Sequence, residues 1–349
     1  MKKYLPKIFS LYKKKIIREL LHTKKTEFNY KIIIKELVYL NLKCEKVLFD
    51  HKNKKGNPIK IILDDLNYFL NKIENLKNFE NFEKNIKIQK IKFNREKSHK
   101  ILFNELWTNF NFSEFKKERL GRYIKRIRIN KLQNKIKNKE IIDFGCGHGN
   151  FLISCLHFGA KNCIGIDYGK NSIKYAKSLS KKFSLNKKIK FYARSVYNSK
   201  LPNSKFDFAI QNGVFHHLDN EVKAYKEMYR VLKKGGFCWV YTDGGGGLRD
   251  YIGDLSQEVL KDINKIFVVK VIRSMSLSTN KEYHLSDSLN ALYRHTDLQS
   301  LKKKLSLIGF KFERQLKGGF DTDFDKPFVK DKYFSQKFGS GDLRLLLRK

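Results

Sequence analysis

A glycine-rich turn flanked by two acidic residues is the part of the sequence best suited to bind a small ligand. Residues 143–149 read DFGCGHG, and a second acid, Asp167, follows Gly149 by eighteen residues. Glycines let the backbone approach a ligand closely and adopt positive φ at a turn, and the N-terminal amides of a following helix point to the same place. A carboxylate such as Asp167 can accept both hydrogens of a ribose diol. The spacing therefore predicts a site for an adenosine nucleoside that carries an amino-acid tail.

The turn departs from the fingerprint of nicotinamide dinucleotide sites. That fingerprint is G-x-G-x-x-G, and here Asn150 occupies the place of its third glycine. Asp143 would repel a pyrophosphate at this position, whereas it would attract a ligand that bears an ammonium group. Both differences favour a nucleoside with an amino-acid tail over a dinucleotide.

The turn belongs to a stretch in which short apolar runs alternate with helical patterns. The predicted strands are 141–144, 163–166, 189–193, 206–210 and 236–242, and helices are predicted at 151–158, 171–179 and around 221–232. Strands that alternate with helices are typical of parallel pairing with right-handed crossovers. A later helix at 298–307 and strands at 309–315 and 343–347 are also predicted. The sequence therefore indicates an α/β fold.

At these residues the chain resembles the class I S-adenosylmethionine-dependent methyltransferases, especially the methyltransferase-11 and UbiE-like group. The matching stretches are IIDFGCGHGNF, CIGIDYGKNSIKYAK, LPNSKFDFAIQNGVFHHL and MYRVLKKGGFCWVYT, all within residues 138–243. The resemblance implies a Rossmann-like, doubly wound, seven-stranded and mostly parallel sheet. It also implies a transferase enzyme that uses S-adenosyl-L-methionine for methylation.

The resemblance further implies which residues bind that cofactor. Asp143 would lie near the methionine amino group, Asp167 would bind the ribose hydroxyls, and Tyr168 would pack on the adenine. The Asp that the family usually carries after the third strand is absent, so Ser195 or a backbone amide would replace it. The full predicted set, which includes no metal ligand, is Asp143, Gly145, Cys146, Gly147, Gly149, Asp167, Tyr168, Ser195, Val196 and Asn212.

The end of the fourth strand carries information about the methyl acceptor. An N-P-P-Y type motif, found there in methyltransferases that act on adenine or on glutamine amides, is absent, and no Cys lies between residues 163 and 238 to act as a cytosine nucleophile. The G-V-x-H-H form at 213–217 resembles small-molecule and lipid methyltransferases instead. His216 and Asp243 are the candidate catalytic bases, because an oxygen or nitrogen nucleophile can need a proton removed. The alternative role of His216 is to cap the helix or to pack against the cofactor, and the alternative for Asp243 is a plain loop carboxylate.

Composition narrows the class of protein. The 349 residues carry 74 Lys+Arg against 35 Asp+Glu, a formal net charge of +39, and 41% of them are hydrophobic. That hydrophobic share suffices for a core, and no membrane-spanning run or signal peptide is expected. The five cysteines are scattered and odd in number, which favours reduced thiols in the cytoplasm. Lys, Asn, Ile and Phe are abundant together, a mix that AT-rich codons produce without any nucleic-acid partner.

The chain is long enough for two domains. We expect a basic N-terminal extension or small domain of unknown role at 1–98 and a methyltransferase domain at 99–349. Insertions at 244–294 and 317–340 would form lids over the pocket. Near the N-terminus, apolar residues follow helical spacing with Lys13, Lys14 and Arg18 between them; they are Ile8, Leu11, Tyr12, Ile16, Leu20 and Leu21. This pattern fits either a helix that packs on its own domain, which we prefer, or peripheral contact with a membrane.

Three functions are compatible with these observations. The first is methyl transfer to an O, N or C atom of a small molecule or lipid-like metabolite. The second is RNA methylation, with the basic N-terminal region as a docking module; we favour it less. The third is a protein that binds the cofactor without catalysis. The acceptor and the oligomeric state cannot be read from the sequence.

Overall fold

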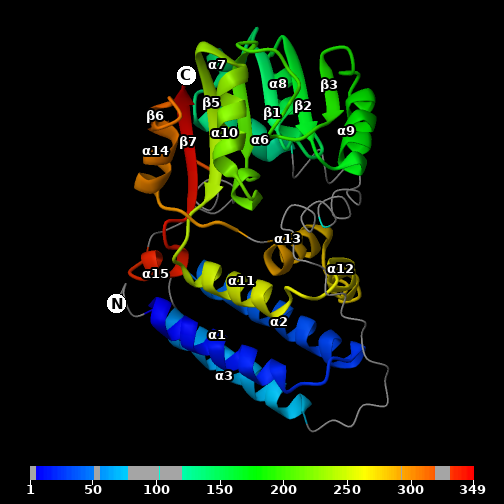
Figure 1. Ribbon diagram of the computed structural model, residues 1–349, viewed down its shortest axis with the longest axis vertical. Helices are drawn as coiled ribbons and strands as arrows, with labels where there is room; N and C mark the ends of the chain where they lie inside the picture. The colour runs from blue at the N-terminus through cyan, green and yellow to red at the C-terminus, as the bar shows by residue number, and fades with distance from the viewer. Residues whose placement is uncertain (1–4, 51–55, 78–101, 103–119, 292, 319–330) are drawn as a thin grey trace. The chain divides into compact units, whose positions relative to one another are not determined.

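The computed structural model describes residues 5–50, 56–77, 102, 120–291, 293–318 and 331–349. The chain forms two compact units, each assembled from three separate segments. One unit comprises residues 1–94, 245–293 and 329–341, and the other comprises 95–244, 294–328 and 342–349. We call them the helical unit and the sheet unit, after their elements in Figure 1.

The sheet unit is built on seven strands in the order β3-β2-β1-β4-β5-β7-β6. The strands are β1 Glu140–Phe144, β2 Asn162–Asp167, β3 Ile189–Ala193, β4 Phe206–Asn212, β5 Leu232–Asp243, β6 Lys311–Gln315 and β7 Asp342–Arg348. All neighbouring pairs from β3 to β5 are parallel, whereas β7 runs antiparallel to both β5 and β6. The predicted seven-stranded, mostly parallel sheet is therefore confirmed.

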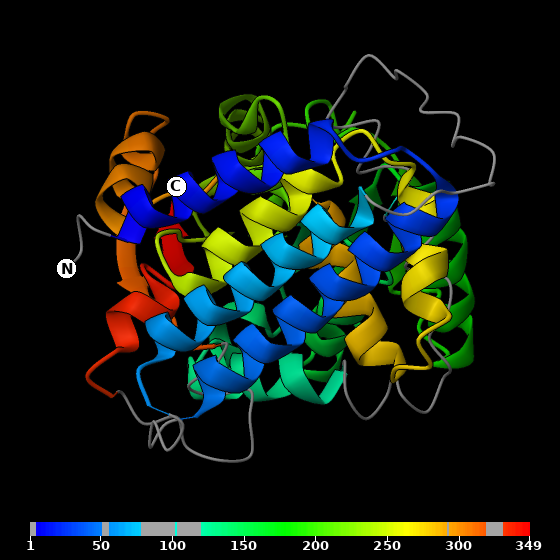
Figure 2. The ribbon, with the colours of Figure 1, turned by 90° about the horizontal axis from the view of Figure 1, so that it is seen from below.

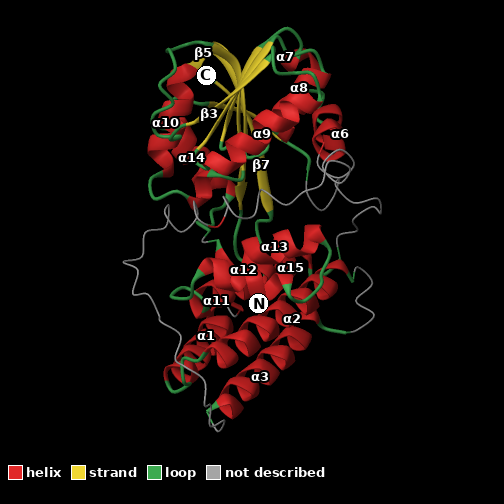
Figure 3. Ribbon diagram, turned by 90° about the vertical axis from the view of Figure 1, so that its right-hand side faces the viewer, coloured by secondary structure: helices red, strands yellow, loops and turns green. Residues whose placement is uncertain are grey.

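Helices cover both faces of this sheet, as Figure 3 shows. They are α6 Gly121–Ile129, α7 Gln133–Ile136, α8 Asn150–His157, α9 Lys170–Lys182, the short 3₁₀ helix η2 Phe215–His217, α10 Glu221–Val231 and α14 Leu298–Ser306. One buried cluster joins α6, α8 and α9 to one face, and a second joins α10 and α14 to the other. A parallel sheet buried on both faces needs nearly continuous apolar strands, which explains runs such as Cys163-Ile164-Gly165-Ile166 in β2.

The carboxyl ends of the parallel strands meet at one edge of the sheet. Phe144 pairs with Ile166 of β2 and with Gln211 of β4. Asp167 pairs with Ala193, and Asn212 pairs with Tyr241. The loops that carry the predicted ligand-binding residues therefore emerge side by side, as expected for the ligand edge of an open α/β sheet.

The helical unit joins the N-terminal helices to segments that follow them by about two hundred residues. Its helices are α1 Leu5–Leu21, α2 Glu27–Phe49, α3 Pro58–Leu76, α11 Leu248–Val259, α12 Lys265–Arg273, α13 Thr279–Asn290 and α15 Phe334–Phe338. α2 is the centre of the unit, because it contacts α3, α11, α12 and α13. Phe9 of α1 stacks on Tyr251 of α11 with ring centroids 4.9 Å apart.

The units divide the chain differently from the predicted domains. The predicted boundary at 98/99 lies outside the described residues, as do residues 319–330 of the second predicted insertion. Residues 245–293 and 329–341, which overlap the predicted insertions 244–294 and 317–340, belong to the same compact unit as the N-terminal helices. The physical reason is that apolar faces on α2, α11 and α12 bury one another. The spacing of residues within one helix does not predict which distant helix it packs against. The role of these insertions as lids stays a prediction.

Candidate active site

Backbone hydrogen bonds hold the glycine turn after β1 against the end of β2. The amides of Gly145 and Cys146 both donate to the carbonyl of Ile166, at 2.8 and 3.0 Å. Gly149, at φ +76°, is the N-cap residue of α8, and a Cβ at this position would lie 2.4 Å from the Phe191 ring. A side chain is therefore excluded at Gly149 both by backbone conformation and by space. The turn presents the N-terminus of α8 at the ligand edge, as the sequence predicts.

Asp167 organises the turn as well as ending β2. Its Oδ2 accepts a hydrogen bond from the Gly147 amide at 3.0 Å, and its Oδ1 accepts one from the Gly169 amide at 2.7 Å. Burial raises the pKa of this carboxyl, and the amides of Gly169, Gly147 and Tyr168 oppose that effect. A carboxylate has about four acceptor positions, so the backbone amides do not use all of them. The capacity that remains can serve a ribose hydroxyl.

Asp143 is a buried acid near the end of β1 with one unsatisfied oxygen. It is 3% exposed, and its Oδ1 has no hydrogen-bond partner within the described part of the chain. Burial, and next to it the charge of Asp167, raises the pKa of Asp143 well above its usual range. A buried acceptor without a partner is costly. A ligand ammonium would supply both the missing donor and the opposite charge.

The remaining predicted cofactor residues differ in how well their surroundings would allow them to bind the cofactor. Tyr168 follows Asp167 directly and is 55% exposed. Ser195 follows β3, but its hydroxyl accepts a hydrogen bond from the Tyr197 amide at 3.2 Å. Val196 is buried in the core that packs against α10 and α14, and Cys146 is also buried, which raises the pKa of its thiol.

Asn212, at the end of β4, is held by two aromatic residues. Its amide donates to the Tyr123 hydroxyl at 2.9 Å, and its carbonyl accepts from the Trp239 indole at 3.1 Å. Tyr123 lies on α6 and packs on Phe151 of α8 with ring centroids 4.7 Å apart. The sequence analysis missed Tyr123, because a single Tyr on a basic amphipathic helix carries no motif. Its hydrogen bond fixes the Asn212 side chain at the end of β4.

His216 is enclosed in a hydrogen-bond network. Its Nδ1 accepts from the Asp243 amide at 3.0 Å and lies 3.2 Å from the Thr242 hydroxyl, while its Nε2 lies 3.0 Å from Nε2 of His217. Because Nδ1 accepts a backbone N–H, the proton of the neutral ring belongs on Nε2, facing His217. Both ring nitrogens are therefore engaged within the protein. This geometry favours a packing role, and catalysis by His216 stays a prediction.

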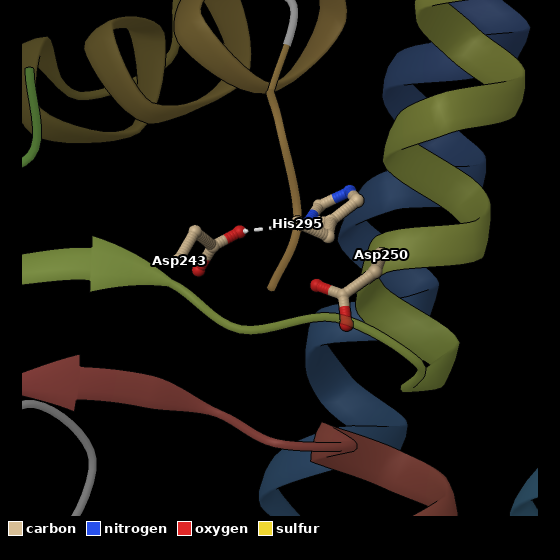
Figure 4. A group of neighbouring side chains, drawn as sticks. All are labelled: Asp243, Asp250 and His295. Atoms are coloured by element: carbon tan, nitrogen blue, oxygen red, sulfur yellow. Dashed lines mark ion pairs between the residues drawn. The ribbon is translucent and has the colours of Figure 1, made fainter. Parts of the chain in front are cut away.

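Asp243 ends β5 and lies beside a histidine that is far from it in the sequence. Figure 4 shows the ion pair between Asp243 Oδ2 and His295 Nδ1, which are 3.5 Å apart. A backbone bridge between Gly244 and Thr296 holds the two segments together. Asp250, also drawn there, caps α11 within the helical unit by accepting a hydrogen bond from the Gly247 amide at 2.9 Å. An Asp–His pair is a common arrangement for a proton acceptor, and this role too stays a prediction.

Comparison with known proteins identifies the class of the sheet unit. A family described as a methyltransferase domain matches residues 142–240, which run from β1 into β5 and include the glycine turn and Asp167. The chain contains a class I S-adenosylmethionine-dependent methyltransferase domain. The predicted family is thus confirmed, and S-adenosylmethionine is the cofactor of this class of domain. Its residues fit that cofactor, because Asp143 offers an unsatisfied acceptor and the Asp167 carboxylate keeps acceptor capacity beyond its backbone hydrogen bonds.

Curated relatives of the methyltransferase domain act on several kinds of molecule. A tRNA U34 carboxymethyltransferase of Helicobacter acinonychis is 34% identical over 103 residues, which is 29% of this chain and 39% of that protein. A sterol 24-C-methyltransferase of Aspergillus fumigatus is 31% identical over 110 residues, covering 30% of this chain and 29% of that one. An ajmaline N-methyltransferase of Rauvolfia serpentina is 29% identical over 102 residues, covering 28% and 34%. The chain thus spans well under half the length of each of these relatives.

Solved structures with a similar methyltransferase domain have low sequence identity to this chain. One is an S-adenosylmethionine-dependent methyltransferase of Thermotoga maritima, at 16% identity and a TM-score of 0.44, covering 71% of this chain and 99% of that one. Another is the 1,6-didemethyltoxoflavin-N1-methyltransferase of Burkholderia thailandensis, at 13% identity and a TM-score of 0.45, covering 74% and 91%.

Proposed function

We propose that this protein transfers the methyl group of S-adenosylmethionine to a nucleophilic O, N or C atom of a small or lipid-like molecule. The observation that supports S-adenosylmethionine as the methyl donor is a pair of acids at the ligand edge: Asp143 is buried with one unsatisfied oxygen, and the half-buried Asp167 is tied to the glycine turn. An ammonium and a ribose diol are the groups that these two carboxyls would bind, and the cofactor contains both.

The residues of the chain act mainly by positioning. The cofactor supplies an electrophilic methyl group on a sulfonium. Asp143 binds and orients the amino-acid tail, Asp167 binds the ribose, and Asn212, fixed by Tyr123, keeps the end of β4 in place. In-line displacement gains most of its acceleration from such orientation. Where the acceptor is an O–H or N–H group, the Asp243–His295 pair is the better placed of the two candidate bases, because His216 already uses both ring nitrogens.

A small or lipid-like acceptor is supported by the G-V-x-H-H segment and by relatives named for sterol and alkaloid methylation. RNA is the second candidate acceptor. A tRNA-modifying relative and the net charge of +39 favour it. The match to that relative covers 103 residues, only 39% of the relative's length, so it is weak support for a shared methyl acceptor.

A panel assay separates these candidates. Purified protein is incubated with S-adenosylmethionine and, in turn, a lipid extract, a polar metabolite extract and total RNA, and release of S-adenosylhomocysteine is measured. We expect turnover with the lipid or metabolite extract. Turnover with RNA alone would select the second candidate. Tight cofactor binding without turnover on any fraction would mean a binding protein and would refute transferase activity.

A further inference from the structure

The solvent-facing side of α1 combines basic and apolar side chains in one stripe. Leu11 and Leu21 are 51% and 72% exposed. Lys7, Lys14 and Arg18 are exposed as well. These five positions are separated by four, three, four and three residues, so they lie on one face of the helix. The stripe runs about 21 Å along the helix axis, at 1.5 Å per residue over fourteen residues.

The opposite side of α1 is already buried within the helical unit. Leu5, Phe9 and Ile16 are at most 6% exposed. Figure 2 shows α1 beside α3 in the helical unit, and these two helices are in contact. Packing on its own unit therefore accounts for the buried face of α1. It does not account for the two leucines on the outer face.

The charge on α1 has one sign at the surface. The helix carries five basic residues and a single acid, Glu19. Glu19 is 8% exposed and pairs with Lys77 and Arg18, so it adds little negative charge to the outer face. An anionic partner would therefore meet basic groups along the whole stripe.

We infer that the outer face of α1 docks the protein on an anionic membrane surface. Lysine and arginine bind anionic headgroups, and leucines enter the boundary between headgroups and acyl chains. An RNA partner would use the same charges but would gain nothing from exposed leucines, since bases stack on aromatic rings. No helix in the described ranges is long and apolar enough to cross a membrane, so the contact would be peripheral. This inference goes beyond the proposed function and does not depend on it.

Vesicle co-sedimentation of the full chain tests the inference. The probes are vesicles of phosphatidylcholine alone and of phosphatidylcholine with 30% phosphatidylglycerol. We expect binding to the anionic vesicles that weakens as salt rises, because charged contacts are screened. Replacing Lys7, Lys14 and Arg18 with Gln should lower the partition coefficient about 100-fold at low salt, at roughly fivefold per charge, and should flatten the salt dependence. Replacing Leu11 and Leu21 with Ser should lower it about fivefold per leucine and leave the salt dependence unchanged.

Matched controls lie in the sheet unit. Leu307 is 80% exposed, so Leu307→Ser removes a leucine that is more exposed than Leu11 or Leu21. Lys174, Lys177 and Lys181 are exposed on α9, and changing them to Gln removes the same charge. Both controls should bind vesicles within about twofold of the wild type. Equal losses in the controls would mean general attraction of a basic protein and would overturn the inference.

Two further outcomes would overturn it as well. One is absence of binding to the anionic vesicles. The other is binding of a 30-nucleotide RNA that the α1 charge variant abolishes while vesicle binding is unaffected. Cofactor affinity, measured by calorimetry on the same variants, should equal that of the wild type. A failure of docking is thereby distinguished from a failure of the proposed methyl transfer.

Discussion

Replacing Asp167 with Asn tests the cofactor site, because it exchanges one carboxylate oxygen for an NH₂ group and keeps the shape of the side chain. In the wild type, one carboxylate oxygen accepts from the Gly147 amide and the other from the Gly169 amide. An Asn amide keeps one acceptor oxygen, and its NH₂ group would face a backbone N–H. The variant therefore loses one bond to the turn, one acceptor for the ribose, and the negative charge.

The expected effect divides into a stability part and an affinity part. A hydrogen bond to a charged group contributes about 1.5–3 kcal/mol. The lost backbone bond lowers the stability of the turn by about that amount, and the lost ribose contact weakens cofactor binding by a similar amount. The affinity part corresponds to a rise in Kd of roughly 10- to 150-fold, since about 1.4 kcal/mol is a factor of ten.

Isothermal titration calorimetry with S-adenosylhomocysteine measures the affinity part directly. Asp207→Asn is the matched control, because Asp207 also accepts a backbone amide hydrogen bond, from Glu140 at 2.9 Å, and pairs with Lys233. Asp207 lies at the start of β4, at the other end of the strand from the ligand edge. The control should lower the thermal midpoint and leave Kd unchanged. A wild-type Kd in Asp167→Asn would refute the assignment of the ribose site.

Three other substitutions test separate parts of the structure. Asp143→Asn should weaken cofactor binding yet raise the thermal midpoint of the ligand-free protein at pH 7. The reason is that burial raises the pKa of Asp143 in the folded state. The carboxyl therefore contributes to stability at low pH, and this contribution is lost as pH rises from about 4 through the raised pKa. An Asp143→Asn variant that is less stable than the wild type at pH 7 would contradict this. Gly149→Ala should cost about 2 kcal/mol or more of stability by denaturant unfolding, since its Cβ would meet Phe191; an unchanged midpoint would argue against the turn geometry. Lys337→Met should destabilise the helical unit by about 3 kcal/mol, because the buried ammonium pairs with Asp331 at 2.7 Å, and a loss under 1 kcal/mol by thermal melting would show that the pair contributes little.

The sheet could be predicted from the sequence because its signals are local. Each buried parallel strand is a short apolar run, and glycines at 145, 147 and 149 mark the turn after the first of them. The predicted strands at 163–166 and 189–193 correspond to β2 Asn162–Asp167 and β3 Ile189–Ala193. The two acids follow from the same logic, since a carboxylate placed at the end of a parallel strand faces the ligand edge.

The helical unit and the outer parts of the site could not be predicted in this way. Segments 245–293 and 329–341 join the N-terminal helices through apolar contacts between distant parts of the chain, and amphipathic spacing says only that a helix buries a face, not against what. His295 reaches Asp243 across fifty residues for the same reason. The helical spacing of α1 is also a local signal, but which of its leucines are buried depends on the packing of the helical unit, which leaves Leu11 and Leu21 exposed.

Transfer of labelled methyl groups tests the central claim most directly. The protein is supplied with S-adenosylmethionine labelled on its methyl group together with lipid, metabolite and RNA fractions, and the label in each fraction is counted against the S-adenosylhomocysteine formed. We predict label in a lipid or small-molecule product, equal in amount to the S-adenosylhomocysteine, with at least a tenfold loss in Asp167→Asn at a cofactor concentration below the wild-type Kd. S-adenosylmethionine that binds but leaves no label in any fraction would contradict the account.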